Sequence, residues 1–153
     1  MINFIGDYTC KIDSKGRILF PAALKKQLGN IISQFVVKRD LFENCLVMYT
    51  IEEWENQNTI IRSQINIFNK EHNRFLRGFY RGTAEISLDG SSRILIPKRL
   101  LVNVGIDKEV ILSGQDAKIE IWSKEAYDNI IEDEDIFASL AQQIMQAPKN
   151  KED

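Results

Sequence analysis

The sequence lacks several features that would each point to a particular class of protein. No stretch approaches the roughly 18 uninterrupted apolar residues that a membrane-spanning helix needs, so no membrane span is predicted. The first ten residues, MINFIGDYTC, show no basic segment followed by a long apolar one, so we expect no signal peptide. We therefore expect a cytoplasmic protein.

Cysteine and histidine are scarce. The 153 residues include two cysteines, Cys10 and Cys45, and one histidine, His72. A structural zinc site needs about four such ligands, and disulfides are rare in a reducing cytosol. We interpret both cysteines as packing residues and expect no metal and no cofactor.

The sequence motifs of common enzyme classes are also missing. There is no GxSxG, GxxxxGK[ST] or HExxH motif, and no GxGxxG follows a strand. His72 falls within the apolar stripe of an expected helix, and Glu52 and Glu53 fit a solvated helix face. The sequence therefore predicts neither an enzyme nor a small-molecule substrate.

A basic excess is lacking too, since the net charge is −2, but the charge is unevenly distributed. Residues 1–99 hold 15 Lys and Arg against 10 Asp and Glu, whereas residues 100–153 hold 5 against 12. Because phosphate binding needs only a local basic face, the composition permits a nucleic-acid surface without requiring one.

What the sequence does contain is one phrase that occurs twice. DSKGRILFP starts at Asp13 and DGSSRILIP starts at Asp89, 76 residues later. Further matches in the same order extend over roughly 45 residues, so the chain contains an internal duplication.

Each copy has the pattern of a ββαββ unit, with Gly, Ser and Asp in the first turn, a proline before the helix and a glycine after it. The expected strands are 8–12, 17–20, 35–39 and 45–50 in one copy and 84–88, 93–96, 109–113 and 117–122 in the other, with helices 22–28 and 98–104. Strands this short cannot form a stable sheet within one copy. We therefore predict an α+β fold, mainly β with helices, in which both copies interleave into one pseudo-twofold β-barrel without exposed strand edges.

The expected boundaries are 5–52 for repeat 1, 53–80 for a connecting helix, 81–124 for repeat 2, 125–146 for a C-terminal helical segment and 147–153 for a charged tail. The apolar spacing from Ile51 to Arg77 predicts one long amphipathic helix with a solvated basic side and a partly buried His72. Ile136, Leu140 and Ile144 form a stripe that could pack either on the core or on a neighbouring subunit.

The repeated phrase allows two interpretations. Asp13 and Asp89 can accept hydrogen bonds from the turn amides and pair with the arginine four residues later, which makes each turn a structural latch. Arg17 and Arg93 can also bind phosphate oxygens or the O6/N7 edge of guanine in a major groove. Lys15 at the turn tip and Lys11 before it would add cations.

Two segments resemble the repeats of the MraZ family. They are residues 6–28, which contain IDSKGRILFPAALKKQL, and residues 77–100, RGFYRGTAEISLDGSSRILIPKRL. The resemblance covers roughly residues 1–146. It implies a swapped-hairpin (double-split) barrel related to the AbrB and SpoVT DNA-binding proteins, and a bacterial transcriptional regulator that acts as a repressor. It also implies a nucleoid-associated, ring-shaped homo-oligomer that binds direct repeats of double-stranded DNA upstream of the division and cell-wall gene cluster. The DNA-binding phrase then falls on Asp13, Lys15, Gly16 and Arg17 in the first repeat and on Asp89 and Arg93 in the second.

The second phrase departs from the family pattern. Ser92 stands where the family commonly has a glycine, so we expect Gly90 to provide the permissive backbone position two residues earlier. Ser91 replaces the cation Lys15. We therefore expect the first copy to contact DNA and the second to act mainly as a latch. The alternative function is an AbrB-like barrel that binds a protein partner, as an interaction module or an antitoxin.

Overall fold

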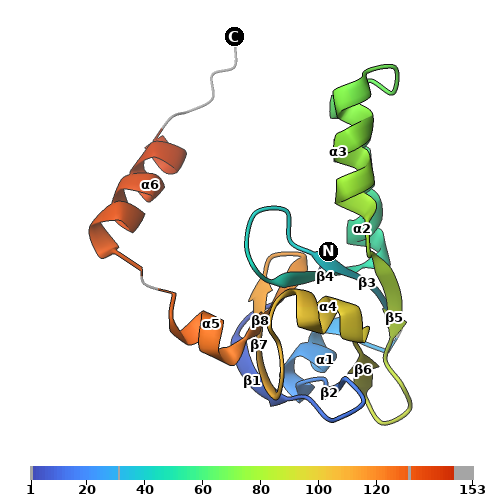
Figure 1. Cartoon of the computed structure of the whole chain (residues 1–153). Helices are drawn as coiled ribbons and strands as arrows, with labels where there is room; N and C mark the ends of the chain where they lie inside the picture. The colour runs from blue at the N-terminus through green and yellow to red at the C-terminus, as the bar shows by residue number, and fades with distance from the viewer. Residues whose placement is uncertain (1, 31, 131, 147–153) are drawn as a thin grey trace.

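The computed structural model describes residues 2–30, 32–130 and 132–146, and the predicted charged tail at 147–153 lies outside them. Two ββαββ units appear in chain order, separated by a pair of helices and followed by two more (Figure 1). The first unit and the helix pair are β1 (Asp7–Lys11), β2 (Arg17–Leu19), α1 (Ala22–Leu28), β3 (Gln34–Arg39), β4 (Leu46–Thr50), α2 (Ile51–Gln64) and α3 (Lys70–Tyr80). The remainder is β5 (Ala84–Ser87), β6 (Arg93–Leu95), α4 (Lys98–Asn103), β7 (Glu109–Gln115), β8 (Lys118–Ser123), α5 (Lys124–Asp128) and α6 (Glu134–Gln146).

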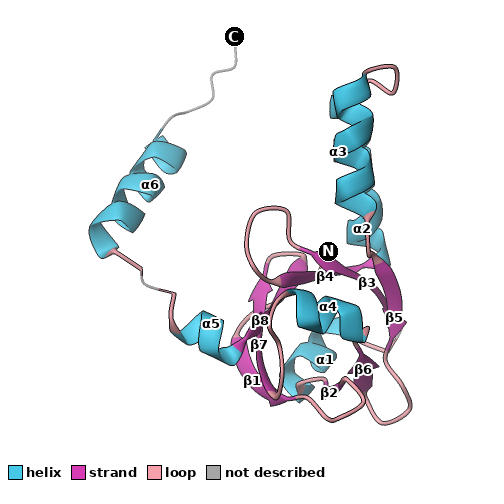
Figure 2. Cartoon of the chain, viewed as in Figure 1, coloured by secondary structure: helices cyan, strands magenta, loops and turns pink. Residues whose placement is uncertain are grey.

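The strands of the two copies interleave. The six-stranded sheet has the order β1-β7-β8-β4-β3-β5, so the first strand of each copy pairs with the third strand of the other. The remaining strands, β2 and β6, form a separate two-stranded antiparallel ribbon, seen at the bottom of Figure 2. This exchange of strands confirms the predicted swapped-hairpin, α+β architecture.

A pseudo-twofold axis relates the copies, and the pairing register shows where it passes. In the ribbon, Ile18 pairs with Ile94, and these residues hold equivalent positions in the two phrases. Both are fully buried. Because each copy contributes one strand to this pair, neither copy can complete the core alone.

Helices α1 and α4 contribute leucines to the same core. Leu24 and Leu28 of α1 and Leu100 and Leu101 of α4 are buried in the cluster that also holds Ile18 and the inward side chains of the sheet. Proline precedes each helix, as the sequence predicts, although it occupies the capping position rather than the first helical one. The two helices thus anchor the ends of the ribbon strands that precede them.

The prediction of one helix from Ile51 to Arg77 is wrong, because residues 65–69 turn the chain back and divide it into α2 and α3. Asparagines stabilise this turn. The Asn69 side chain accepts hydrogen bonds from the N–H groups of Glu71 and His72, which caps α3, and the Asn66 side chain accepts one from Phe68. Such side-chain bonds compete with helix continuation. The apolar periodicity persists through the turn, which is why it suggested a single helix.

The two helices form an antiparallel hairpin with an aromatic base. The ring of Trp54 in α2 lies 6.2 Å from that of Phe79 in α3, in a stacked arrangement, and the Tyr80 hydroxyl donates a 2.6 Å hydrogen bond to Asn58. Lys38 of β3 lies over the Phe79 ring at 4.2 Å. These contacts fix the base of the hairpin to the barrel, while its tip points away from it (Figure 1).

Helix α6 does not pack on the core. None of its residues is buried, and in Figure 1 it lies clear of the barrel, on the side opposite to α3. Of the two placements considered for the stripe Ile136, Leu140 and Ile144, the structure therefore shows no packing on the chain's own core. Within the described part of the chain, no helix combines the length and apolar character needed to cross a membrane.

Candidate nucleic-acid interface

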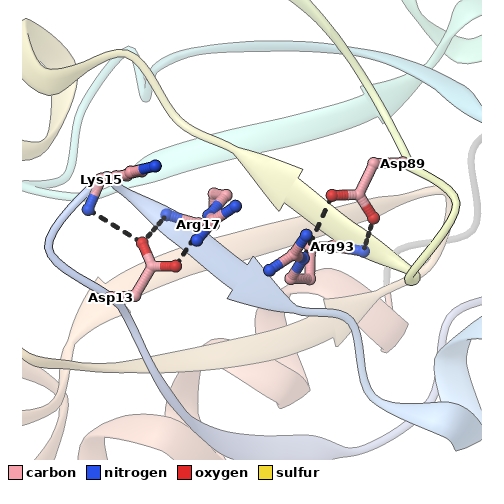
Figure 3. A network of polar contacts seen from close by, with 5 residues as sticks. All are labelled: Asp13, Lys15, Arg17, Asp89 and Arg93. Atoms are coloured by element: carbon pink, nitrogen blue, oxygen red, sulfur yellow. Dashed lines mark hydrogen bonds and ion pairs between the residues drawn. The ribbon is translucent and has the colours of Figure 1, made fainter.

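The first Asp-x-x-x-Arg turn is closed by one carboxylate. Asp13 Oδ1 accepts hydrogen bonds from the backbone N–H groups of Lys15 and Arg17, both at 2.9 Å, and Oδ2 accepts one from Arg17 Nε at 2.7 Å (Figure 3). The backbone adds a bond from Gly16 N–H to the Asp13 carbonyl at 3.0 Å. The Asp–Arg contact expected across this turn is therefore present.

The second turn has the same set of hydrogen bonds. Asp89 Oδ1 accepts from the N–H groups of Ser91 and Arg93 at 2.8 and 2.9 Å, and Oδ2 accepts from Arg93 Nε at 3.1 Å. Ser92 N–H donates to the Asp89 carbonyl at 3.0 Å. The replacement of Gly16 by Ser92 has thus not changed the architecture of the turn.

The expectation that Gly90 provides the permissive position of the second turn is wrong. The residue with positive φ is Ser92, at 62°, in the place where Gly16 has a φ of 88°. The turn keeps its shape because the Asp89 carboxylate binds two of its amides, and this holds Ser92 in a conformation that side chains disfavour. The Ser92 hydroxyl accepts a hydrogen bond from Lys25 Nζ of the other copy.

The two turns are also tied to each other. Ile96 N–H donates to the carbonyl of Gly16 at 3.0 Å, and Phe20 N–H donates to that of Ser92 at 2.8 Å. Gly16 is buried, and a Cβ there would lie 3.0 Å from the Ile96 carbonyl oxygen. Each turn is therefore hydrogen-bonded to the residue that directly follows the ribbon strand of the other copy.

The ribbon formed by β2 and β6 has one buried and one exposed face. Alternation along the strands buries Ile18 and Ile94 and places Arg17, Leu19, Arg93 and Leu95 together on the outer face. The register opposes Arg17 to Leu95 and Leu19 to Arg93. The outer face therefore carries two arginines on one diagonal, as Figure 3 shows, and two leucines on the other.

The leucines were missed as site residues. Leu19 is 62% exposed and Leu95 is 53% exposed, although both lie within strands. The signal was present in the sequence, because Arg-Ile-Leu in a strand puts the first and third residues on the same face.

The arginines retain unused hydrogen-bonding capacity. Each guanidinium donates from Nε to its aspartate, and within the described residues no protein group accepts from its terminal nitrogens. The side chains of Arg17 and Arg93 are 31% and 34% exposed. An aspartate that orients an arginine while leaving its planar end free preorganises it for a phosphate or a guanine edge.

Lysines surround the ribbon on the side of the first copy. Lys15 is exposed at the turn tip, and Lys11 is exposed at the end of β1. Lys11 and Lys25 line a groove of about 860 Å³ beside the ribbon, together with Leu19 and with Ser91 and Ser92 of the second turn. Of the predicted residues, Lys11 lines this groove, to which both copies of the repeat contribute.

Both latch carboxylates remain charged well into the acid range. The backbone N–H of Arg17 is the largest cause that lowers the pKa of Asp13, and the backbone N–H of Arg93 does the same for Asp89, while partial desolvation opposes both. The arginine side chains add to the lowering of each pKa. At neutral pH both aspartates are therefore charged acceptors for the turn.

One group elsewhere brings potential metal ligands together. Atoms of Asp40, Cys45 and Glu120 lie within 4.8 Å of one another. However, Asp40 already accepts two turn amides, and Glu120 accepts the indole N–H of Trp122. Burial raises the pKa of Cys45 to about 12, so its thiol is protonated at neutral pH. The cluster is explained as packing and turn structure.

Comparison with known proteins identifies the family of the chain. A family model described as "MraZ protein, putative antitoxin-like" matches residues 3–78 and again residues 79–147, so each match contains one copy of the repeat. The chain is 44% identical over 149 residues to "Transcriptional regulator MraZ" of Christiangramia forsetii, covering 95% of this chain and 94% of the relative. It is 41% identical over 147 residues to the protein of the same name from Flavobacterium psychrophilum, with coverages of 95% and 93%. It is 37% identical over 150 residues to the protein of the same name from Cytophaga hutchinsonii, covering 97% of this chain and 98% of the relative. The chain belongs to the MraZ family.

Proposed function

We propose that this protein is a cytoplasmic, nucleoid-associated transcriptional repressor that binds double-stranded DNA through the outer face of the β2–β6 ribbon. The observation that carries the proposal is the pair of arginines, Arg17 and Arg93, oriented by Asp13 and Asp89 with their terminal nitrogens free. The relatives are named transcriptional regulators, which supports the same reading.

A two-stranded ribbon fits the major groove of B-DNA. The outer face of the β2–β6 ribbon has arginines that can bind guanine edges or phosphates and leucines that can contact thymine methyl groups. The exposed Lys11 and Lys15 would bind phosphates at its edge. Both arginines are held in the same way, so we propose that the second turn contacts DNA as well and is not a latch alone. The first turn contributes more, because Ser91 supplies no counterpart to Lys15.

Gly16 has a different role in this proposal. It is buried, and its N–H and carbonyl are both engaged in hydrogen bonds, so it shapes the turn that presents Lys15 and Arg17. It contributes to DNA binding through that geometry, not through a contact of its own.

The DNA that the proposal assigns is a set of short direct repeats upstream of the division and cell-wall gene cluster. A homo-oligomer presents one ribbon per subunit to successive repeats. Each ribbon then needs only modest affinity, because binding of the first repeat raises the effective concentration of the next ribbon at its repeat.

The proposal is tested by an electrophoretic mobility shift with the protein's own promoter fragment. Arg17→Ala removes the free guanidinium and should abolish the shifted band at concentrations where the wild type binds fully. Arg62→Ala, which removes an exposed arginine of α2 far along the chain from the ribbon, is the matched control and should bind as the wild type does. Undiminished binding by Arg17→Ala would overturn the proposal.

The second candidate is a protein-binding role of the antitoxin type, which the description of the family model favours. On that account the ribbon arginines would bind no DNA, and the promoter fragment would not shift with the wild type either. The same gel therefore separates the two functions.

A further inference from the structure

Helix α6 is amphipathic but has no partner within its own chain. Ile136, Phe137, Leu140 and Ile144 lie on one side of it and are 63%, 61%, 50% and 72% exposed. An apolar stripe of this size on a surface helix marks a contact with another molecule. The residues before and at its start, 132–135, are four consecutive exposed acids.

The pseudo-symmetry indicates what kind of partner is missing. Thr50 caps α2 after the first copy, and Ser123 caps α5 after the second, each by accepting a hydrogen bond from the third residue onward. Helix α3 follows α2 and packs against it, so α6 holds the corresponding place after α5. However, α5 has only 5 residues against 14 in α2, so it offers α6 no comparable surface.

The helical hairpin carries a surface of complementary character. A shallow groove on α3 is lined by Leu76 and Tyr80 together with Asn73, Arg77 and Arg81. Arg74 and Lys70 extend the basic side, and among the residues the structure describes no carboxylate lies within 4.0 Å of these cations. The groove thus offers apolar contacts with unpaired positive charge beside them.

The two surfaces match in length as well as in charge. At about 1.5 Å per residue, α6 is about 20 Å long and α3 about 16 Å long. The apolar stripe of α6 would meet Leu76 and Tyr80, and its acidic start would meet the arginines. Within one chain, α6 and α3 lie on opposite sides of the barrel (Figure 1), so these two surfaces can meet only between different subunits.

We infer that α6 of one subunit docks in the groove on α3 of a second subunit, and that this contact builds the homo-oligomer. The inference rests on the assembly in the proposed function and names its two contact surfaces. Because the two surfaces differ, the contact is heterologous, and each subunit offers one free α6 and one free groove. Repetition of such a contact closes into a ring when the rotation between neighbours permits it.

Two variants of the full chain test the inference by analytical ultracentrifugation. Leu140→Glu puts a charge into the apolar stripe of α6 and leaves the groove intact. The double substitution Arg77→Glu with Arg81→Glu reverses the charge beside the groove and leaves α6 intact. Each variant alone should sediment as a monomer where the wild type assembles. Gln142→Glu, which adds the same charge on the opposite side of α6, should assemble as the wild type does.

The decisive step is to mix the two variants in equal amounts. One junction between intact surfaces should form, so a two-chain complex should appear and no larger species. Assembly of the Arg77/Arg81 variant alone, which is expected if α6 pairs with α6, would overturn the inference. A mixture in which the two variants do not associate with each other would overturn it too. The masses are measured without DNA, so failure of this contact is distinguishable from failure of the ribbon to bind DNA. Leu140→Glu keeps the ribbon and should still bind a single repeat with unchanged affinity.

Discussion

Ser92 and Gly16 occupy the same place in two turns of the same architecture, which allows a reciprocal exchange. Ser92 has a φ of 62°, a region that costs a residue with a Cβ about 1–2 kcal/mol. Ser92→Gly removes this strain but increases the conformational freedom of the unfolded chain, which offsets about 0.4–1 kcal/mol. It also removes the hydrogen bond from Lys25 Nζ to the Ser92 hydroxyl, which adds little because the bond is exposed and water replaces it. The variant should therefore be more stable by about 0.5–1 kcal/mol.

The reverse substitution, Gly16→Ser, should cost more. It introduces the same backbone strain at a φ of 88° and places a Cβ 3.0 Å from the backbone carbonyl oxygen of Ile96, a buried residue directly after β6. The N–H group of the same residue, Ile96, donates a hydrogen bond to the Gly16 carbonyl, so a shift of Ile96 would disturb this bond. We expect a loss of about 2 kcal/mol after the gain from the unfolded state is subtracted.

Differential scanning calorimetry at one fixed protomer concentration measures both effects, because the stability of an oligomer depends on concentration. For a chain of this size, about 1 kcal/mol corresponds to about 2–4 °C in Tm. Ser92→Gly should raise Tm by about 1–4 °C and Gly16→Ser should lower it by about 4–8 °C. A lower Tm for Ser92→Gly would refute the reasoning that Ser92 is strained, and an unchanged Tm for Gly16→Ser would refute the tight packing at the first turn.

Two further predictions concern the ribbon and its latches. Ile18→Ala should cost roughly 3 kcal/mol in urea unfolding, because Ile18 is fully buried, whereas Leu19→Ala at the adjacent exposed position should change stability by less than about 0.5 kcal/mol; equal costs would contradict the assignment of the two faces. Titration of the carboxyl carbons by NMR should place the pKa values of Asp13 and Asp89 below 3.8. Since folding lowers the pKa of each aspartate, the charged carboxylates stabilise the fold fully above the unfolded-state pKa. This stabilisation is lost as the pH falls through the folded-state pKa. A pKa at or above 3.8 for either residue would show that its turn amides do not bind the carboxylate.

Much of the barrel followed from the sequence because its repeat is so regular. The helix over Ala22–Leu28 was predicted at its observed bounds, and the strands agree within a few residues, since proline, glycine and alternation mark their ends locally. The interleaving also followed, because strands this short need partners from the other copy.

The errors arose where side-chain hydrogen bonds outweighed local pattern. Nothing in the apolar spacing distinguishes a long helix from a hairpin, and the Asn66 and Asn69 bonds that end α2 and cap α3 depend on the folded turn. In the same way, glycine preference pointed to Gly90, but the Asp89 carboxylate fixes the amides so that Ser92 takes the positive φ. The sequence could not decide where α6 lies either, because an exposed apolar stripe fits the chain's own core and another molecule equally well.

We propose above all that the guanidinium of Arg17, oriented by Asp13, binds DNA. The most direct test is the affinity of the wild type and Arg17→Ala for a promoter fragment with two repeats, measured by fluorescence anisotropy over a range of salt concentrations. Loss of one bidentate contact costs about 1–3 kcal/mol per repeat, so the loss of this contact at two linked repeats should weaken binding by at least about 30-fold. The fall of affinity with salt should also become shallower for the variant if the contact is to phosphate. Equal affinities for the two proteins at every salt concentration would contradict the claim.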